Sequence, residues 1–411
     1  IIFFFLSINI AILNDKTLQI QNLTIVENIA FNSIIFLNFI LCLSFLNFNL
    51  NKIILIYILY LCFLITIYLY KFKSLFNFTK DNLIQLGLLF FTSFIIFLEV
   101  ANNLIIGWDA QKFWIYKTLN FYNGNTIANL SNLQNPWYPH LGSLSWSFFW
   151  KFSLIGNEYA GRLFYTFLYL TSLLLIVENF NFSKFYKAIF YVLLIIISYD
   201  YTHHSHWSMF SGYQEIIVFS LVLIAMHFLY QISKNAENLK IIDILKILLI
   251  CNLLVWIKQE GLIISLALIF TLILFFKINL NKKIYILAIF LLIIFFRYFI
   301  FEFYNLNPNN IYHAGYTDIS LLTIFEKVSF ERVLTIAKFL FLGLFSNYLI
   351  LIGLFILLFV ILKKEDIKKI FYVLFFFLFN IFIFCGIYLI ADTDLNHMLE
   401  TGIDRIIFQI S

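Results

Sequence analysis

Long apolar runs recur along the whole chain, and polar residues are mostly confined to the short stretches between them. If helical, most of these runs can cross about 30 Å of hydrocarbon, and none shows the alternating pattern of barrel strands. The pattern predicts an all-α polytopic membrane protein. The apolar segments lie at roughly 31–49, 52–70, 83–106, 139–156, 161–177, 185–200, 212–230, 241–257, 261–276, 284–303, 333–362 and 370–390.

The composition supports this fold class. Of the 411 residues, 63% are hydrophobic and only 12% are charged, about half the charged fraction of a typical soluble domain. No basic patch indicates a nucleic-acid partner. The cysteines fall inside apolar runs without a shared spacing, as expected of small buried hydrophobes. We therefore expect a single integral membrane domain over residues 1–411.

The topology depends on segment 139–156, which is short and carries Trp146, Trp150 and Lys151. If this segment spans the membrane, the lysine clusters before and after it fall on opposite sides. If it lies flat in the interface as an amphipathic helix, the clusters share one face, which the positive-inside rule makes cytoplasmic. We adopt the second option, which predicts about eleven spanning helices.

This topology gathers the chemically unusual segments on the outer face. They are a first large loop at 107–160, the stretch at 199–212, the break at 258–261, a second loop at 304–332 and a tail at 391–411. We expect an integral protein of a bacterial inner membrane, with its working groups on the periplasmic side and membrane lipids around it.

Asp109 is the first candidate for chemistry, because it follows an apolar segment by about one helical turn and opens the first large loop. A carboxylate at this boundary can take a proton from a hydroxyl, and nearby low-dielectric walls strengthen its charge interactions. Alternatively, Asp109 is an ordinary acid at a helix end, solvated or paired with Lys112.

The stretch "NPWYPHLGSLSWSFFW" at 135–150 places two of the three prolines of the chain just before His140. Proline fixes φ and lacks an N–H group, so this stretch redirects the chain from the loop into the amphipathic helix. His140 could contact a phosphate or a sugar hydroxyl, or it is simply an interfacial residue.

Glu158 and Arg162 lie four residues apart where the next apolar segment begins. The spacing is typical of a local ion pair on a helix. Charges at a membrane boundary are energetically unfavourable, which leaves a role in substrate binding open.

The stretch "VWIKQEGLI" at 255–263 puts Lys258 and Glu260 between two apolar segments without an ordinary loop. It forms either a tight outer turn with a local ion pair or a lysine at headgroup depth, suited to holding a phosphate. Arg297 and Arg405 could converge on the same anion.

A histidine cluster precedes Glu215 in "YTHHSHWSMFSGYQE". Two of these histidines, His204 and His206, could bind a divalent cation together with Glu215. The competing interpretation is hydrogen bonding with interfacial water.

Taken in order, these features resemble the membrane glycosyltransferases of the GT-C fold, in the branch of protein mannosyltransferases and bacterial aminoarabinose transferases. The likeness covers residues 83–300. "YPHLGSLSWSFFW" followed by "GNEYAGRLFYTFLYLTSLLL" resembles the Tyr-Pro-Pro-Leu segment and arginine-led helix of that branch, and "WIKQEG" resembles its interrupted later helix. The chain departs from the branch in having His140 in place of the second proline and Ala110 after Asp109. Apolar segments also precede the Asp109 loop.

The resemblance implies an inverting transferase that moves a sugar from a polyprenyl-phosphate-linked donor to a hydroxyl of a lipid, glycan or protein. Asp109 would deprotonate the acceptor, while Lys258, Arg405 and Arg297 would hold the donor phosphate as charge develops. The remaining substrate contacts would come from Lys112, Tyr138, His140, Glu158, Arg162 and Glu260. Some members of the fold use a divalent cation and others do not.

Two other functions remain open. A flippase-type transporter predicts internal repeats and charges near the middle of the membrane, and no repeat is visible. A polymerase or ligase of lipid-linked glycans typically carries its large outer loop late in the chain, whereas here the loop is early.

Overall fold

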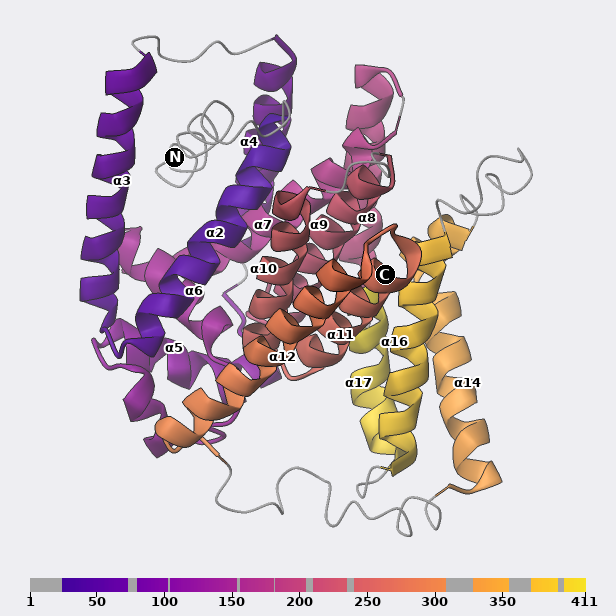
Figure 1. Ribbon diagram of the computed structural model, residues 1–411. Helices are drawn as coiled ribbons and strands as arrows, with labels where there is room; N and C mark the ends of the chain where they lie inside the picture. Colours follow the sequence, from indigo (N-terminus) through magenta and orange to yellow (C-terminus); the bar gives the residue numbers. More distant parts are fainter. Residues whose placement is uncertain are drawn as a thin grey trace.

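The computed structural model describes residues 24–72, 80–102, 104–153, 156–180, 182–204, 210–234, 240–307, 328–354, 371–390 and 395–411. Within these ranges the secondary structure is entirely helical (Figure 1). The α-helices are α2 Ile25–Phe45, α3 Leu50–Phe72, α4 Lys80–Asn102, α5 Ile115–Tyr122, α6 Leu141–Phe152, α7 Tyr159–Glu178, α8 Lys184–His204, α9 Glu215–Lys234, α10 Ile241–Ile257, α11 Glu260–Phe275, α12 Leu280–Phe303, α14 Phe330–Ser346, α16 Phe371–Ile390 and α17 Leu395–Ile410.

Several of these helices are long and apolar enough to cross a membrane. Over the described residues there are 7 such helices, or up to 8 if α14 and the helix Tyr348–Leu354, which meet at a bend of 80°, form one span. The fold is that of a polytopic helical membrane protein, while the number of about eleven spans stays a prediction. The 7 are α2, α4, α7, α8, α9, α12 and α16.

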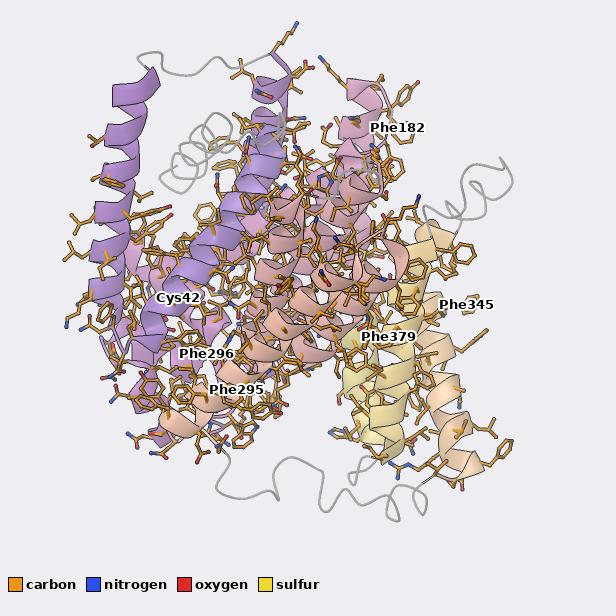
Figure 2. The ribbon with its side chains drawn as sticks, in the orientation of Figure 1. Cys42, Phe182, Phe295, Phe296, Phe345 and Phe379 are labelled. Carbon is orange, nitrogen blue, oxygen red and sulfur yellow. The ribbon has the colours of Figure 1, made fainter. Side chains whose placement is uncertain are left out.

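The helices form an inner set and an outer set. α7 and α9 are buried along most of their length, whereas α4, α8, α12 and α16 expose most of theirs. Large apolar side chains cover the outside, as Phe295 on α12 and Phe345 on α14 illustrate (Figure 2). Such a surface favours lipid tails over water as its surroundings.

The bundle is sided (Figure 1). The end of α3 and the beginning of α4 lie at the top of the view, whereas α12 ends and α14 begins at the bottom. α5 and α6 lie low in the bundle, and α17 rises from the bottom next to α16. The first large loop and the C-terminal segment are therefore at the same side of the molecule.

Local capping explains why α2 begins earlier than the apolar run at 31–49. The Thr24 hydroxyl accepts from the Glu27 N–H at 3.2 Å, and the Glu27 carboxylate accepts from the Thr24 N–H at 2.7 Å. This capping box satisfies N–H groups that a helix start otherwise leaves without partners. The polar residues before the apolar run thus belong to the helix.

The stretch predicted as a first large loop is mostly helical. It contains a π-helix, Ala110–Trp114, then α5, a 3₁₀ helix, Ile127–Asn132, and α6. α6 has 12 residues, about 18 Å at 1.5 Å per residue, too short to span. It is also buried over most of its surface, unlike the amphipathic surface helix that we expected.

Serine hydroxyls explain how both faces of α6 can be covered. Ser143 donates to the carbonyl of Trp114 at 3.0 Å, and Ser147 donates to the carbonyl of Thr118 at 2.7 Å. These bonds join α6 to the π-helix and α5. Because each buried hydroxyl is satisfied, the polar side of α6 needs no water.

The expected tail is also a helix. α17 is amphipathic, with polar residues between its apolar ones, so no long apolar run in the sequence indicates it. Phe408 of α17 stacks on Phe219 of α9 with ring centroids 4.5 Å apart, and Tyr201 of α8 donates to the Asp404 carbonyl at 3.1 Å. Of the predicted outer segments, 154–155, 205–209, 308–327 and 391–394 lie outside the described residues.

A first testable prediction concerns the break between α10 and α11. A Cβ added at Gly261 would lie 2.0 Å from the Leu254 carbonyl oxygen, which is backbone and cannot move aside easily. Gly261→Ala is therefore expected to lower the free energy of unfolding by about 1–3 kcal/mol, measured by thermal unfolding in detergent. Gly87→Ala in α4 is the control, because its Cβ would meet nothing within 4 Å. Equal stability of the two variants would contradict the close approach.

Candidate functional site

The break between α10 and α11 places two opposite charges side by side. Lys258 adopts an extended backbone after α10, and α11 begins two residues later at Glu260. The Lys258 ammonium lies 3.1 Å from the Glu260 carboxylate. Lys258 is almost fully buried, so the break turns a cation into the protein and not toward solvent.

Glu215, the first residue of α9, connects this pair to the C-terminal helix. Its carboxylate is fully buried and accepts from the Lys258 ammonium at 2.9 Å and from the Arg405 Nε at 2.5 Å. The Arg405 guanidinium also pairs with Asp109. Four separate parts of the chain therefore meet in one charged cluster, which consists of Asp109, Glu215, Lys258, Glu260 and Arg405.

The cluster has three acids and two bases, so its formal charge is −1. Among the described residues, the second carboxylate oxygen of Glu215, Oε2, has no hydrogen-bond partner. Burial raises the pKa of Asp109 and the nearby charge of Glu215 adds to the rise, against opposing contributions from Arg405 and Lys258. A raised pKa makes Asp109 a stronger base than an ordinary aspartate.

The two cations of the cluster remain charged despite their burial. Burial alone would lower the pKa of Lys258, but the carboxylates of Glu215 and Glu260 outweigh it and raise that pKa. Burial is likewise outweighed at Arg405, where Glu215 and Asp109 raise the pKa. The site thus holds two permanent positive charges beside a carboxylate of increased basicity.

Two tyrosines border the cluster. The Arg405 guanidinium lies over the Tyr213 ring, 5.1 Å from its centroid, a cation–π geometry. Burial and the charge of Glu260 raise the pKa of the Tyr138 hydroxyl, which also lies in the field of Lys258 and Asp109. Tyr138 and Tyr213 therefore remain protonated hydrogen-bond donors at neutral pH.

The Glu158–Arg162 pair at the start of α7 contacts the two segments that lead into the cluster. The two side chains form the expected ion pair, with Nε 2.7 Å from Oε1. Arg162 also donates to the carbonyl oxygens of Phe210 at 2.8 Å and Ile105 at 3.4 Å. Arg162 thereby connects the segment before Asp109 with the segment before Glu215.

A close backbone contact completes this connection. The Gly107 N–H donates to the Ser211 carbonyl at 2.8 Å. A Cβ at Gly107 would lie 2.1 Å from the Tyr213 ring, and Gly212 has φ of +92°, a conformation that favours glycine. The two glycines allow the backbone segments that precede Asp109 and Glu215 to pack closely against each other.

Three further predicted site residues have other partners or surroundings than the charged cluster. His140 is buried with Nε2 3.1 Å from the Ser44 hydroxyl, and burial lowers its pKa to about 3, so it carries no charge for a phosphate. Arg297 donates to the Val255 carbonyl at 2.9 Å, where α10 ends. Lys112 is exposed on the π-helix, and Asp109 pairs with Arg405 instead.

The predicted cation site cannot be assembled from the described side chains. The side chains of His204 and His206 fall outside them, and Glu215 is occupied by two cations. In the part of the chain that the structure describes, no group of three or more His, Cys, Asp or Glu residues is arranged to hold a metal ion. A divalent cation as cofactor stays a prediction.

Glu215 is the member of the cluster whose role the sequence did not indicate. It was a candidate metal ligand, whereas the structure shows it between two cations. The available signal was its position, since an acid at the first turn of an otherwise apolar helix needs a partner when it is buried. Tyr213, two residues earlier, gave no signal.

No family model, no curated protein and no solved structure matches the chain. Its function is therefore argued from the charged cluster. The arrangement offers a base of raised pKa within one ion-pair network that holds a buried cation, Lys258, and a partly buried one, Arg405. This combination can accept a proton and stabilise a developing negative charge at the same time.

Proposed function

We propose that the protein is an inverting membrane glycosyltransferase that uses a polyprenyl-phosphate-linked sugar as donor. It would work on the periplasmic face of a bacterial inner membrane and modify a hydroxyl of a lipid, glycan or protein. The observation that carries this proposal is the connection of Asp109 to Lys258 through Arg405 and Glu215. The connection supplies a base and an anion-binding pair in one place.

In the proposed reaction Asp109 takes the proton of the acceptor hydroxyl. The hydroxyl oxygen forms a bond to the anomeric carbon while the bond from that carbon to the phosphate oxygen breaks on the opposite face. The electron pair leaves with the polyprenyl phosphate, and the configuration inverts. Lys258 and Arg405 stabilise the negative charge that develops on the leaving phosphate.

The two cations retain donors for this task. The Lys258 ammonium has three N–H donors and uses two, on Glu215 and Glu260. Arg405 uses Nε and Nη2, while Nη1 has no hydrogen bond to any described residue. A phosphate can therefore approach Arg405 and Lys258 without breaking the pairs that keep them charged.

Apolar surface next to Asp109 supports a lipid-borne substrate. Ile105 is 69% exposed and Trp108 is 62% exposed, directly before the carboxylate in the chain. Exposed apolar side chains next to a buried charged site let an isoprenoid chain lie against protein while its phosphate enters the cluster. A soluble sugar-nucleotide donor would not need such a surface.

The position of the charges argues against a flippase-type transporter. Glu215 begins α9, Lys258 follows α10 and Asp109 precedes the π-helix, so each of these charges lies at a helix end. Transporters of that kind place their charges near the membrane midplane. A polymerase or ligase of lipid-linked glycans would share the donor site and differ in the size of the group transferred.

Native mass spectrometry with a panel of polyprenyl-phosphate sugars tests the donor assignment. Lys258→Ala is expected to weaken donor binding by about 10- to 100-fold, since a hydrogen bond to a charged group contributes roughly 1.5–3 kcal/mol. Lys80→Ala is the matched control, because Lys80 is exposed at the start of α4 and outside the cluster. Failure of the wild type to bind any donor would contradict the proposal, and binding only of long diphosphate-linked glycans would favour a polymerase or ligase.

A further inference from the structure

Lys117 lies in the middle of α5 and is completely buried. Its ammonium donates to the carbonyl oxygens of Pro136, at 3.3 Å, and Tyr138. No carboxylate among the described residues pairs with it. Burial of a lysine whose hydrogen-bond acceptors are all neutral is energetically unfavourable. Such a residue is therefore a candidate for a functional role.

The electrostatic surroundings of Lys117 are simple. Burial lowers its pKa from 10.5 to about 7. The titratable side chain that faces it from α6 is His140, where burial and the charge of Lys117 lower the pKa to about 3. His140 stays neutral, so Lys117 is the group of this pair that titrates near neutral pH.

The carbonyls that Lys117 binds belong to a turn that carries Tyr138. The Tyr138 N–H donates to the Asn135 carbonyl at 3.2 Å, and Asn135 has φ of +56°, which fixes a tight turn. On the far side, the Tyr138 ring stacks on Phe113 with centroids 4.9 Å apart and meets Trp114 edge-on. The Tyr138 backbone and ring are thus held from two directions.

The Tyr138 hydroxyl is close enough to the charged cluster for the charges there to shift its pKa. Glu260, Lys258, Asp109 and Arg405 all influence its hydroxyl. A hydroxyl at this position can donate a hydrogen bond to a sugar or phosphate oxygen bound by the cluster. Its placement depends on the turn that Lys117 holds.

We propose that Lys117 is a positioning residue that holds the 136–138 turn and thereby presents the Tyr138 hydroxyl to the substrate at the charged cluster. This inference rests on the proposed transferase function and extends it to a residue outside the cluster. Lys117 itself touches no substrate, since it is fully covered.

The protonation state of Lys117 gives the proposal a distinctive signature. Charge-assisted hydrogen bonds are roughly twice as strong as neutral ones, so transfer is expected to fall as the pH rises through about 7. The folded pKa is lower than the unfolded value of 10.5, so between these values the unfolded chain binds more protons. Stability therefore rises with pH over that window, opposite to the rate.

The experiment compares wild type with Lys117→Met and Lys117→Arg. Measured are kcat/KM for transfer across pH 7, thermal unfolding, and hydrogen–deuterium exchange of the peptide 133–140. Lys117→Met is expected to lower kcat/KM about tenfold or more, because misplacement by about 1 Å can cost up to 10²-fold, and to increase exchange in that peptide. Lys117→Arg, whose charge persists, is expected to remove the alkaline fall in rate.

The outcomes separate this inference from the function on which it rests. A folded Lys117→Met protein with wild-type kcat/KM, or with unchanged exchange at 133–140, overturns the positioning role and leaves the transferase proposal intact. An alkaline fall that persists in Lys117→Arg also overturns it. If wild type shows neither donor binding nor transfer, the proposed function fails, whatever the exchange of the turn.

Discussion

Asp109→Asn is expected to lower kcat/KM for sugar transfer by about 10²- to 10⁴-fold, the usual contribution of a positioned general base. Donor binding should remain close to that of wild type, because Lys258 and the bridge from Glu215 to Arg405 are unchanged. The measurement combines transfer kinetics with native mass spectrometry of the same preparations. Loss of binding together with turnover would instead assign Asp109 to the donor site.

The pH profile of the wild type checks the same assignment. Burial raises the pKa of Asp109, and only the deprotonated carboxylate can accept a proton. The rate is therefore expected to fall with decreasing pH at a midpoint above that of an ordinary aspartate, about 3.9. A rate independent of pH over this acidic range would contradict the base role.

Asp109→Asn should lose activity with at most a small loss of stability, because the ion pair with Arg405 is lost while the unfavourable burial of the carboxylate charge is relieved. Because the folded pKa of Asp109 is raised, the fold favours the neutral form, and its contribution to stability is lost as the pH rises through that pKa. A neutral amide avoids this loss at neutral pH. Asp81→Asn is the matched control, since Asp81 is exposed and pairs with Lys184 away from the cluster. It should leave kcat/KM unchanged.

Glu215→Gln is expected to give the largest loss of stability, about 3–5 kcal/mol, the usual effect of breaking a buried ion pair from one side. The amide keeps the shape but removes the charge that lies between Lys258 and Arg405. The buried Lys258 and the partly buried Arg405 would then face each other without that charge between them. The measurement is the free energy of unfolding in detergent.

Glu331→Gln provides a control for the position of Glu215 at a helix start. Glu331 is an exposed acid in the first turn of α14, so its replacement should cost no more than the helix-dipole contribution of about 0.3–1 kcal/mol. Adding Lys258→Met to Glu215→Gln should recover part of the loss, because it removes one of the two cations that lose Glu215 as a partner. Equal effects of Glu215→Gln and Glu331→Gln would contradict the bridging role.

The fold class could be predicted from the sequence because a helix that crosses the hydrocarbon core needs a long apolar run, which is visible in the sequence. The segment at 241–257 coincides with α10, since a polar residue flanks each of its ends, Lys240 before it and Lys258 after it. α17 could not be found in this way, because its apolar residues face α9 and α14 while its polar residues alternate with them. α6 was placed on the surface, because the sequence does not show that α5 covers its serines.

The chemistry-bearing residues could be selected from the sequence, but their meeting could not. Asp109, Lys258 and Arg405 were singled out by unusual charges in apolar surroundings, and the structure joins them through Glu215. Arg297 satisfied the same criterion and binds a helix end instead. Lys117 was not singled out from the sequence, because its burial depends on the turn at 136–138 that its ammonium contacts.

The pairing of Asp109 with Arg405 also determines how late in synthesis the complete charged cluster can form. These residues are 296 positions apart in the chain, and at 5–20 residues per second a ribosome needs about 15 to 60 s to cover that distance. Throughout this interval the base and its neighbours are made but lack their guanidinium. A nascent chain halted before α17 thus lacks Arg405, and the complete charged cluster can form only after the ribosome has passed residue 405.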